Sequence, residues 1–233
     1  MTFAVAHRGL PLRLPENTLP SILLAEKHGA VAVEFDVRAT SDGHAVLLHD
    51  KTLARIWGDP RPVAEAPFHE VRALGTEQGG QKIVIPTLEE VVDATSLTLI
   101  VDCKPAGIVA DIAELLASRG QAQRARFIGE PEILSHIRLA MPQADIILSW
   151  SRPEAPPADM LDAIRPSTLN IKWEEGNEAQ VARIARLGYP IWTYTVDDVA
   201  EALRARSLGI EAVISNNFEA VSAALRDAEA GSK

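Results

Sequence analysis

The sequence is poor in cysteine, because Cys103 is the only one among its 233 residues. No internal disulfide can form, and a reducing compartment is permitted. No apolar run reaches the length that a membrane-spanning helix needs. The start, MTFAVAHRGL, lacks the basic region and long apolar stretch of a signal peptide. We therefore expect a soluble, cytoplasmic protein without stable membrane insertion.

Basic residues are outnumbered, with 23 lysines and arginines against 32 aspartates and glutamates, so that the net charge is −9. This balance argues against a nucleic-acid partner, although local basic groups can still bind a small anion. Apolar residues make up 47% and charged residues 24% of the chain, which is typical of a globular protein. A chain of this length can form one domain of the barrel class.

Four segments repeat one pattern, in which an amphipathic helical stripe is followed by a glycine and then by a short β-rich run. The glycines are Gly29, Gly120, Gly188 and Gly209. Candidate capping residues precede three of the helical stripes, at Asn17, Asn177 and Asp197. Strands that alternate with helices predict a parallel sheet with the helices outside it.

Nine β-rich runs can be strands, one more than an eight-stranded barrel needs. The turn signal Ser-Asp-Gly at 41–43 lies between two of them, VAVEFDV and AVLLHD. A hairpin there would bring the second run back to the barrel mouth and place His49 roughly opposite Asp36; a regular parallel strand is the alternative. With the hairpin, the sequence predicts a single (β/α)8 TIM-type barrel over residues 1–233.

Residues 51–85 do not follow the helix–strand pattern. The stretches GDPRPVAEAPF and GTEQGGQKIVIP are rich in proline and glycine. We expect a small irregular insertion near residues 51–85, over the barrel mouth, and no second domain.

Polar side chains gather where the predicted strands end. They are His7, Arg8, Glu34, Asp36, His49, Asp102, Lys104 and Trp173. The C-terminal strand ends of a (β/α)8 barrel form its active-site face, so one rim would receive all of them. Alternation along a strand puts Glu34 and Asp36 on the same face, which at a barrel mouth is the interior.

Three carboxylates at close range, from Glu34, Asp36 and Asp102, repel one another and would have raised pKa values. A hard divalent cation removes that cost. Oxygen ligands suit Mg²⁺ or Ca²⁺, whereas Zn²⁺ prefers imidazole or thiolate. The sequence therefore predicts a site for one divalent cation, either Mg²⁺ or Ca²⁺.

Arg8 and Lys104 supply positive charge beside these carboxylates, and a metal with an arginine and a lysine can clamp a phosphate. His7 and His49 can transfer protons, one as base and one as acid, since imidazole titrates near neutrality. Trp173 and Trp192 can line an alcohol pocket or serve only in packing.

Several stretches resemble the glycerophosphodiester phosphodiesterase family. They are His-Arg-Gly at 7–9, Pro-Glu-Asn-Thr at 15–18, Glu-x-Asp at 34–36, Ser-x-Asp-Gly leading to His-Asp at 49–50, IPTLEEVV at 85–92 and IVDCKP at 100–105. Features of the family extend to PIWTYTV and EAVISNN, so the resemblance covers nearly the whole chain. It implies a barrel, a divalent metal, and hydrolysis of a glycerophosphodiester to glycerol 3-phosphate and an alcohol.

The resemblance also implies roles for single residues, which we write by position. His7 and His49 are the acid–base pair, and Glu34 and Asp36 are metal ligands. Arg8 holds the phosphate. Glu16 and Asn17 shape the substrate-side loop beside the first strand. The chain departs from the family pattern in three places: Asp102 stands for a glutamate, Asp197 for an asparagine, and Ser215-Asn216 for Thr-Asp.

Other functions stay open at this point. A Schiff-base aldolase could use Lys104 as nucleophile. A related phosphodiesterase could act on lysophospholipids or sugar-phosphate diesters with the same metal site, and a degenerate barrel could merely bind a phosphorylated ligand. The sequence also leaves open the released alcohol, the choice of metal, the acid among the two histidines, and the oligomeric state.

Overall fold

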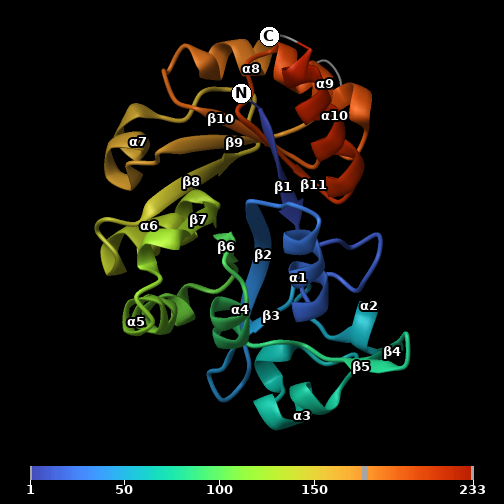
Figure 1. Ribbon diagram of the computed structural model, residues 1–233. Helices are drawn as coiled ribbons and strands as arrows, with labels where there is room; N and C mark the ends of the chain where they lie inside the picture. The colour runs from blue at the N-terminus through green and yellow to red at the C-terminus, as the bar shows by residue number, and fades with distance from the viewer. Residues whose placement is uncertain (1, 175–177, 232–233) are drawn as a thin grey trace.

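The computed structural model describes residues 2–174 and 178–231, and within them eight parallel strands close into a barrel (Figure 1). In order around the barrel they are β1 (Phe3–His7), β2 (Ala32–Ala39), β6 (Thr98–Cys103), β7 (Ala125–Gly129), β8 (Asp145–Trp150), β9 (Thr168–Lys172), β10 (Ile191–Tyr194) and β11 (Ala212–Ser215). β1 pairs with both β2 and β11, which closes the ring. The predicted (β/α)8 barrel is confirmed.

Helices surround the barrel on the outside. They are α1 (Leu19–Lys27), α4 (Leu88–Ala94), α5 (Val109–Ser118), α6 (Pro131–Ala140), α7 (Ala158–Ile164), α8 (Glu178–Ala185), α9 (Val199–Ser207) and α10 (Phe218–Ala230), with 3-10 turns η2 (Ala106–Ile108) and η3 (Ala122–Arg124). Within the described ranges, none of these helices combines the length and the apolar character that crossing a bilayer requires.

The alternation of side chains along each strand separates two cores. On β6, Leu99 and Val101 point outward into the large cluster under the helices, whereas Ile100 points into the barrel. The interior cluster joins side chains from all around the ring. Its members are Val5, Ala32, Ile100, Ile128, Ile147, Trp192, Ala212 and Ile214. This apolar filling occupies the barrel below the strand ends and leaves only the upper face for polar chemistry.

The segment after β2 returns as a hairpin. β3 (Ala45–Leu47) pairs antiparallel with β2, from Val37 opposite Leu47 to Ala39 opposite Ala45. The backbone N–H of Leu48 donates to the carbonyl of Asp36 at 3.0 Å, so His49 lies one residue beyond the position opposite Asp36. The predicted hairpin is confirmed, and the alternative of a regular parallel strand is wrong.

The insertion after the hairpin contains short regular elements. They are α2 (Ala54–Trp57), η1 (Val63–Glu65), α3 (Phe68–Ala73), β4 (Thr76–Gln78) and β5 (Gln81–Ile83). Its apolar residues, among them Trp57, Val71 and Ile85, form a separate buried cluster with Val46 and Leu48 from the hairpin arm. This small core offsets the conformational entropy lost in ordering a stretch that is rich in proline and glycine.

The helix starts differ from those predicted. α1 begins after Thr18, which makes no side-chain cap, and the side chain of Asn17 instead binds Asp36. α9 is capped by Asp198, whose Oδ1 accepts from the backbone N–H of Glu201 at 3.0 Å, while Asp197 binds the end of β11. Two predicted caps therefore act in tertiary contacts. The third, Asn177, lies outside the described residues.

Candidate active site

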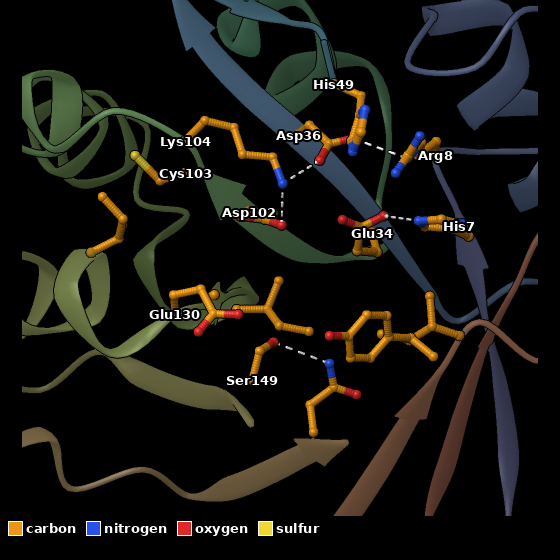
Figure 2. A pocket seen from close by; sticks show the side chains of 16 residues that line it. His7, Arg8, Glu34, Asp36, His49, Asp102, Cys103, Lys104, Glu130 and Ser149 are labelled. Atoms are coloured by element: carbon orange, nitrogen blue, oxygen red, sulfur yellow. Dashed lines mark hydrogen bonds and ion pairs between the residues drawn. The ribbon is translucent and has the colours of Figure 1, made fainter. Parts of the chain in front are cut away.

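A cavity of about 320 Å³ opens at the C-terminal ends of the strands, above the apolar filling of the barrel (Figure 2). Seven polar residues predicted for this rim line it. They are His7, Arg8, Glu34, Asp36, His49, Asp102 and Lys104. They come from β1, β2, the hairpin arm and β6, which are neighbours in the barrel. The strand order therefore explains why residues up to about one hundred positions apart share one cavity.

Three carboxylates form the centre of this group. Strand register places Asp36 beside Asp102 and places Glu34 one pleat below Asp36 on the same inner face. Glu34, Asp36 and Asp102 each offer an oxygen within 4.8 Å of the others. Glu34 is only 4% exposed and Asp36 only 1%. Asp102 is partly exposed. Burial of two carboxylates beside a third is costly unless cations oppose them.

The buried negative charge of Asp36 is compensated by nearby cations and hydrogen-bond donors. Its oxygens accept from Lys104 Nζ at 2.8 Å and from Asn17 Nδ2 at 2.9 Å, and Arg8 Nε lies 3.1 Å away. Burial alone would raise the pKa of Asp36, but Lys104 and Arg8 outweigh it and lower the pKa below its usual range. Asp36 is therefore an anion held between two cations.

Glu34 has no such support. Burial, together with the charges of Asp36 and Asp102, raises the pKa of Glu34 well above its usual value. Its Oε2 is one of the few buried polar atoms in the described ranges without a hydrogen-bond partner, and His7 Nε2 lies 3.6 Å from it. Burial also raises the pKa of Asp102 despite the 2.6 Å bond from Lys104. The unpaired Glu34 oxygen beside Asp36 and Asp102 is a ligand of the type that a hard divalent cation binds.

Arg8 links the carboxylates to the insertion. It directly follows β1 and lies in the left-handed region, with φ 58°. Its guanidinium donates to Glu16 Oε1 at 3.0 Å and also contacts Asp36. Glu16 also binds Arg55 of α2, whose Nε donates to Asp50 at 2.6 Å. Glu16, like Asn17, is absent from the described lining of the cavity. Both residues orient side chains that do line it.

The two histidines have different partners. His7 Nδ1 lies 2.8 Å from Asn216 Oδ1, and burial together with the Arg8 charge lowers the pKa of His7 to about 4. His7 is therefore neutral at neutral pH. His49 Nδ1 lies 2.7 Å from Asp50 Oδ1, and the ring is 39% exposed. Nδ1 of each histidine faces a protein partner. Within the described residues neither Nε2 makes a hydrogen bond, although His7 Nε2 lies 3.6 Å from Glu34 Oε2.

The model of the glycerophosphoryl diester phosphodiesterase family matches residues 7–220. The chain belongs to this family. Glycerophosphodiester phosphodiesterase 1 of Mus musculus is 38% identical over 110 residues, which cover 43% of this chain and 33% of the mouse protein. A glycerophosphodiester phosphodiesterase of Caldanaerobacter subterraneus is 36% identical over 96 residues, or 39% of each chain. These matches thus span about a third of the curated relatives.

Solved structures match over nearly their whole length, and we describe one of them. It is a phosphodiesterase of Oleispira antarctica in complex with the product sn-glycerol-3-phosphate. The two chains are 26% identical, with a TM-score of 0.86 and 96% of each chain covered. The likeness to this structure therefore includes both the barrel and the insertion after the hairpin.

Neither Trp173 nor Trp192 is among the described residues that line the cavity, which favours the packing role that the sequence left open for them. Trp192 is 1% exposed near the N-terminal end of β10, where it packs edge-on against Phe3 and its Nε1 donates to Glu211. Trp173 donates to Glu201 of α9 at 2.8 Å. Alternation along the strand explains why the Trp173 side chain does not face the cavity. Asn170, which lines the cavity, and Lys172 lie on one face of β9, and Trp173 follows on the opposite face.

The other side of the cavity was not identified from the sequence. Glu130, Ser149, Asn170 and Tyr194 line it, together with apolar residues such as Ile128. In Figure 2, Glu130 and Ser149 lie across the cavity from Asp36 and Lys104. A signal was available in the sequence, since these residues lie in or directly after the C-terminal halves of β7, β8, β9 and β10. Three of the four are uncharged, whereas the residues that the sequence predicts for the cavity are mainly charged or titratable.

Gly9 fixes the turn that directs Arg8, and we expect Gly9→Ala to destabilise the protein by about 2–5 kcal/mol. Its φ is +89°, and an added Cβ would lie 2.4 Å from Ser21 Oγ and 2.7 Å from the Ser21 carbonyl carbon. Gly29→Ala is the matched control, because Gly29 has φ +85° but a Cβ added there would meet no atom within 4 Å. It should cost only about 1–2 kcal/mol. Urea unfolding measures both, and equal losses would contradict the steric argument.

Proposed function

We propose that this chain hydrolyses glycerophosphodiesters to glycerol 3-phosphate and an alcohol, and that the reaction needs Mg²⁺ or Ca²⁺. The observation that carries the proposal is the cavity in which three carboxylates, two cationic side chains and two histidines converge. Membership of the family and the likeness to a phosphodiesterase that binds sn-glycerol-3-phosphate support it.

Glu34, Asp36 and Asp102 would hold the cation. Asp102 belongs to the group of oxygens within 4.8 Å although its side chain is one methylene shorter than glutamate. Lys104 now bonds to Asp36 and Asp102, so it would share these carboxylates with the metal. A bound Mg²⁺ or Ca²⁺ would neutralise the carboxylates and polarise the phosphoryl oxygens.

Arg8 and Lys104 would bind the phosphate. The Arg8 guanidinium is oriented by Asp36 and Glu16, and the ammonium of Lys104 lies between Asp36 and Asp102. Both cations are held in place before substrate arrives, so they can stabilise the charge that develops on the phosphoryl group at little reorganisation cost.

His7 and His49 would transfer the protons. His7 is neutral and uses Nδ1 for Asn216, so its Nε2 can accept the proton of the attacking oxygen, which belongs to water or to the glycerol 2-hydroxyl. His49 has the carboxylate of Asp50 on Nδ1, which can balance the positive charge of a ring that carries an extra proton. We assign His7 as the base and His49 as the acid that protonates the leaving alkoxide.

The competing functions receive less support. Asp102 and Asp36 outweigh burial and raise the pKa of Lys104 above its usual value, so its amine is protonated and poorly suited to Schiff-base formation. A diesterase for lysophospholipids or sugar-phosphate diesters would keep the same charged residues. It would differ at the side lined by Glu130, Ser149, Asn170 and Tyr194.

The deciding experiment measures glycerol 3-phosphate release from glycerophosphocholine by metal-stripped protein, with and without added Mg²⁺ or Ca²⁺. We expect release only after metal is added, because the carboxylates alone repel the phosphate. Equal release in the presence of a chelator would contradict the metal requirement. No release under any condition, from protein that circular dichroism shows to be folded, would overturn the substrate assignment.

A further inference from the structure

Asp197 lies just after β10 and binds the end of β11 through its carboxylate. Its Oδ1 accepts from the backbone N–H of Asn216 at 2.7 Å and from Ser215 Oγ at 3.2 Å. Its Oδ2 accepts from Asn216 Nδ2 at 2.9 Å. Neither Asp197 nor Asn216 belongs to the described lining of the cavity. Apart from the direct effect of its charge on His7, Asp197 is linked to that histidine by hydrogen bonds through Asn216.

These bonds fix the orientation of the Asn216 amide. An ionised carboxylate can only accept hydrogen bonds, so the amide nitrogen of Asn216 must face Asp197. The amide oxygen then faces His7 Nδ1, which lies 2.8 Å away. That oxygen also only accepts, so the neutral ring must carry its hydrogen on Nδ1. Nε2 is left with its lone pair on the side of Glu34, 3.6 Å from Oε2.

We propose that Asp197 is a positioning residue which, through the Asn216 amide, holds the His7 proton on Nδ1 and keeps Nε2 free as the proton acceptor. The tautomer itself follows from the hydrogen bonds of the resting protein. The catalytic consequence rests on the proposed function, in which Nε2 of His7 accepts a proton. A purely structural link between the two strand ends would leave the tautomer unaffected by the polarity of residue 197.

Asp197→Asn replaces the acceptor oxygen that faces the Asn216 amide by a donor NH₂ group. The new amide oxygen can still accept from the Asn216 backbone and from Ser215, but its NH₂ group then faces Asn216 Nδ2. Two donors cannot pair, so the Asn216 amide should turn over and present its NH₂ group to His7 Nδ1. Nδ1 must then accept, and the ring hydrogen moves to Nε2. We expect kcat to fall about 100-fold or more, as for other catalytic histidines with the wrong tautomer.

The double variant Asp197→Asn/Asn216→Asp should restore function. A carboxylate at position 216 accepts both from the new amide at position 197 and from His7 Nδ1–H. The hydrogen returns to Nδ1, and we expect kcat to recover to within about tenfold of the wild type. If Asp197 only connected the ends of β10 and β11, the double variant would not recover kcat.

The tautomer is read directly by long-range ¹H–¹⁵N spectra of histidine-labelled protein at a pH where the rings are neutral. The His7 signals are identified by their loss in His7→Gln. We expect the Nδ1–H pattern in the wild type and the double variant, and the Nε2–H pattern in Asp197→Asn. An Nε2–H pattern in the wild type overturns the proposal without any variant, as does an unchanged tautomer in folded Asp197→Asn. The expected pattern in a protein that hydrolyses no glycerophosphodiester would support the positioning role while rejecting the proposed function.

Discussion

Replacing His7 or His49 by glutamine is expected to lower kcat for glycerophosphodiester hydrolysis by about 100- to 10,000-fold. Glutamine keeps a polar side chain of similar length but cannot carry a proton between substrate and solvent at neutral pH. Both histidines line the cavity, and neither Nε2 makes a hydrogen bond within the part of the chain that the structure describes. Initial rates of glycerol 3-phosphate release at saturating metal measure the effect. Near-normal turnover in either variant would contradict the two-histidine scheme.

His69→Gln is the matched control, because the His69 side chain on α3 is 80% exposed and does not line the cavity. It should leave kcat unchanged. A substrate with an aryl leaving group, which departs without protonation, separates the two roles. The loss caused by His49→Gln should shrink markedly with this substrate, whereas the loss caused by His7→Gln should persist. The reverse result would exchange the base and the acid.

Local patterns predicted the charged side of the site because each pattern has a single spatial consequence. Alternation puts Glu34 and Asp36 on one face of β2, and closure of a parallel barrel brings the end of β6, with Asp102, beside them. The hairpin followed from Ser-Asp-Gly at 41–43 in the same way. Alternation also bears on Trp173, because a place at a strand end leaves both a pocket and a packing role open, and the side chain in fact contacts Glu201 of α9.

The contacts that orient the site could not be read from the sequence. Asn17 and Asp197 both have the residue type and position of helix caps, and capping is the commonest local use of such residues. Each is instead used by a partner that is close only in the folded barrel, Asp36 for Asn17 and Asn216 for Asp197. The choice between a local and a distant hydrogen bond depends on burial and on strand register. A single sequence does not define either of these closely enough to assign the partner of one residue.

Glu34→Gln and Asp36→Asn should have opposite effects on the stability of the metal-free protein, although both should abolish metal binding. Glu34 is a buried carboxyl with a raised pKa and an unpaired Oε2, so replacing it by a neutral amide should raise the free energy of unfolding by about 1 kcal/mol or more. Asp36 is paired with Arg8 and Lys104, so its replacement should lower that free energy by about 2 kcal/mol or more.

The effects of the two substitutions on stability should depend on pH in opposite ways, because the pKa of Glu34 is raised and that of Asp36 is lowered in the folded protein. Because the folded pKa of Glu34 is raised, the metal-free wild type loses stability as pH rises from the unfolded value near 4.3 through the folded pKa. The advantage of Glu34→Gln should therefore be largest at neutral pH and shrink on acidification. Because the folded pKa of Asp36 is lowered, its contribution is present above about 3.9 and is lost only as pH falls through the folded pKa.

Thermal and urea unfolding with a chelator, and then with Mg²⁺ or Ca²⁺, test both variants against the wild type. Saturating metal at about 100 times its Kd should stabilise the wild type by about 2.7 kcal/mol and neither variant. Activity with metal should fall about 100- to 1,000-fold in both. Destabilisation of the metal-free protein by Glu34→Gln would mean that Glu34 already has a compensating partner, and a metal response that survives both substitutions would place the cation elsewhere. A gain in stability with a loss of activity at Glu34 would instead identify this buried carboxylate as one retained for its ligand, at the expense of the fold.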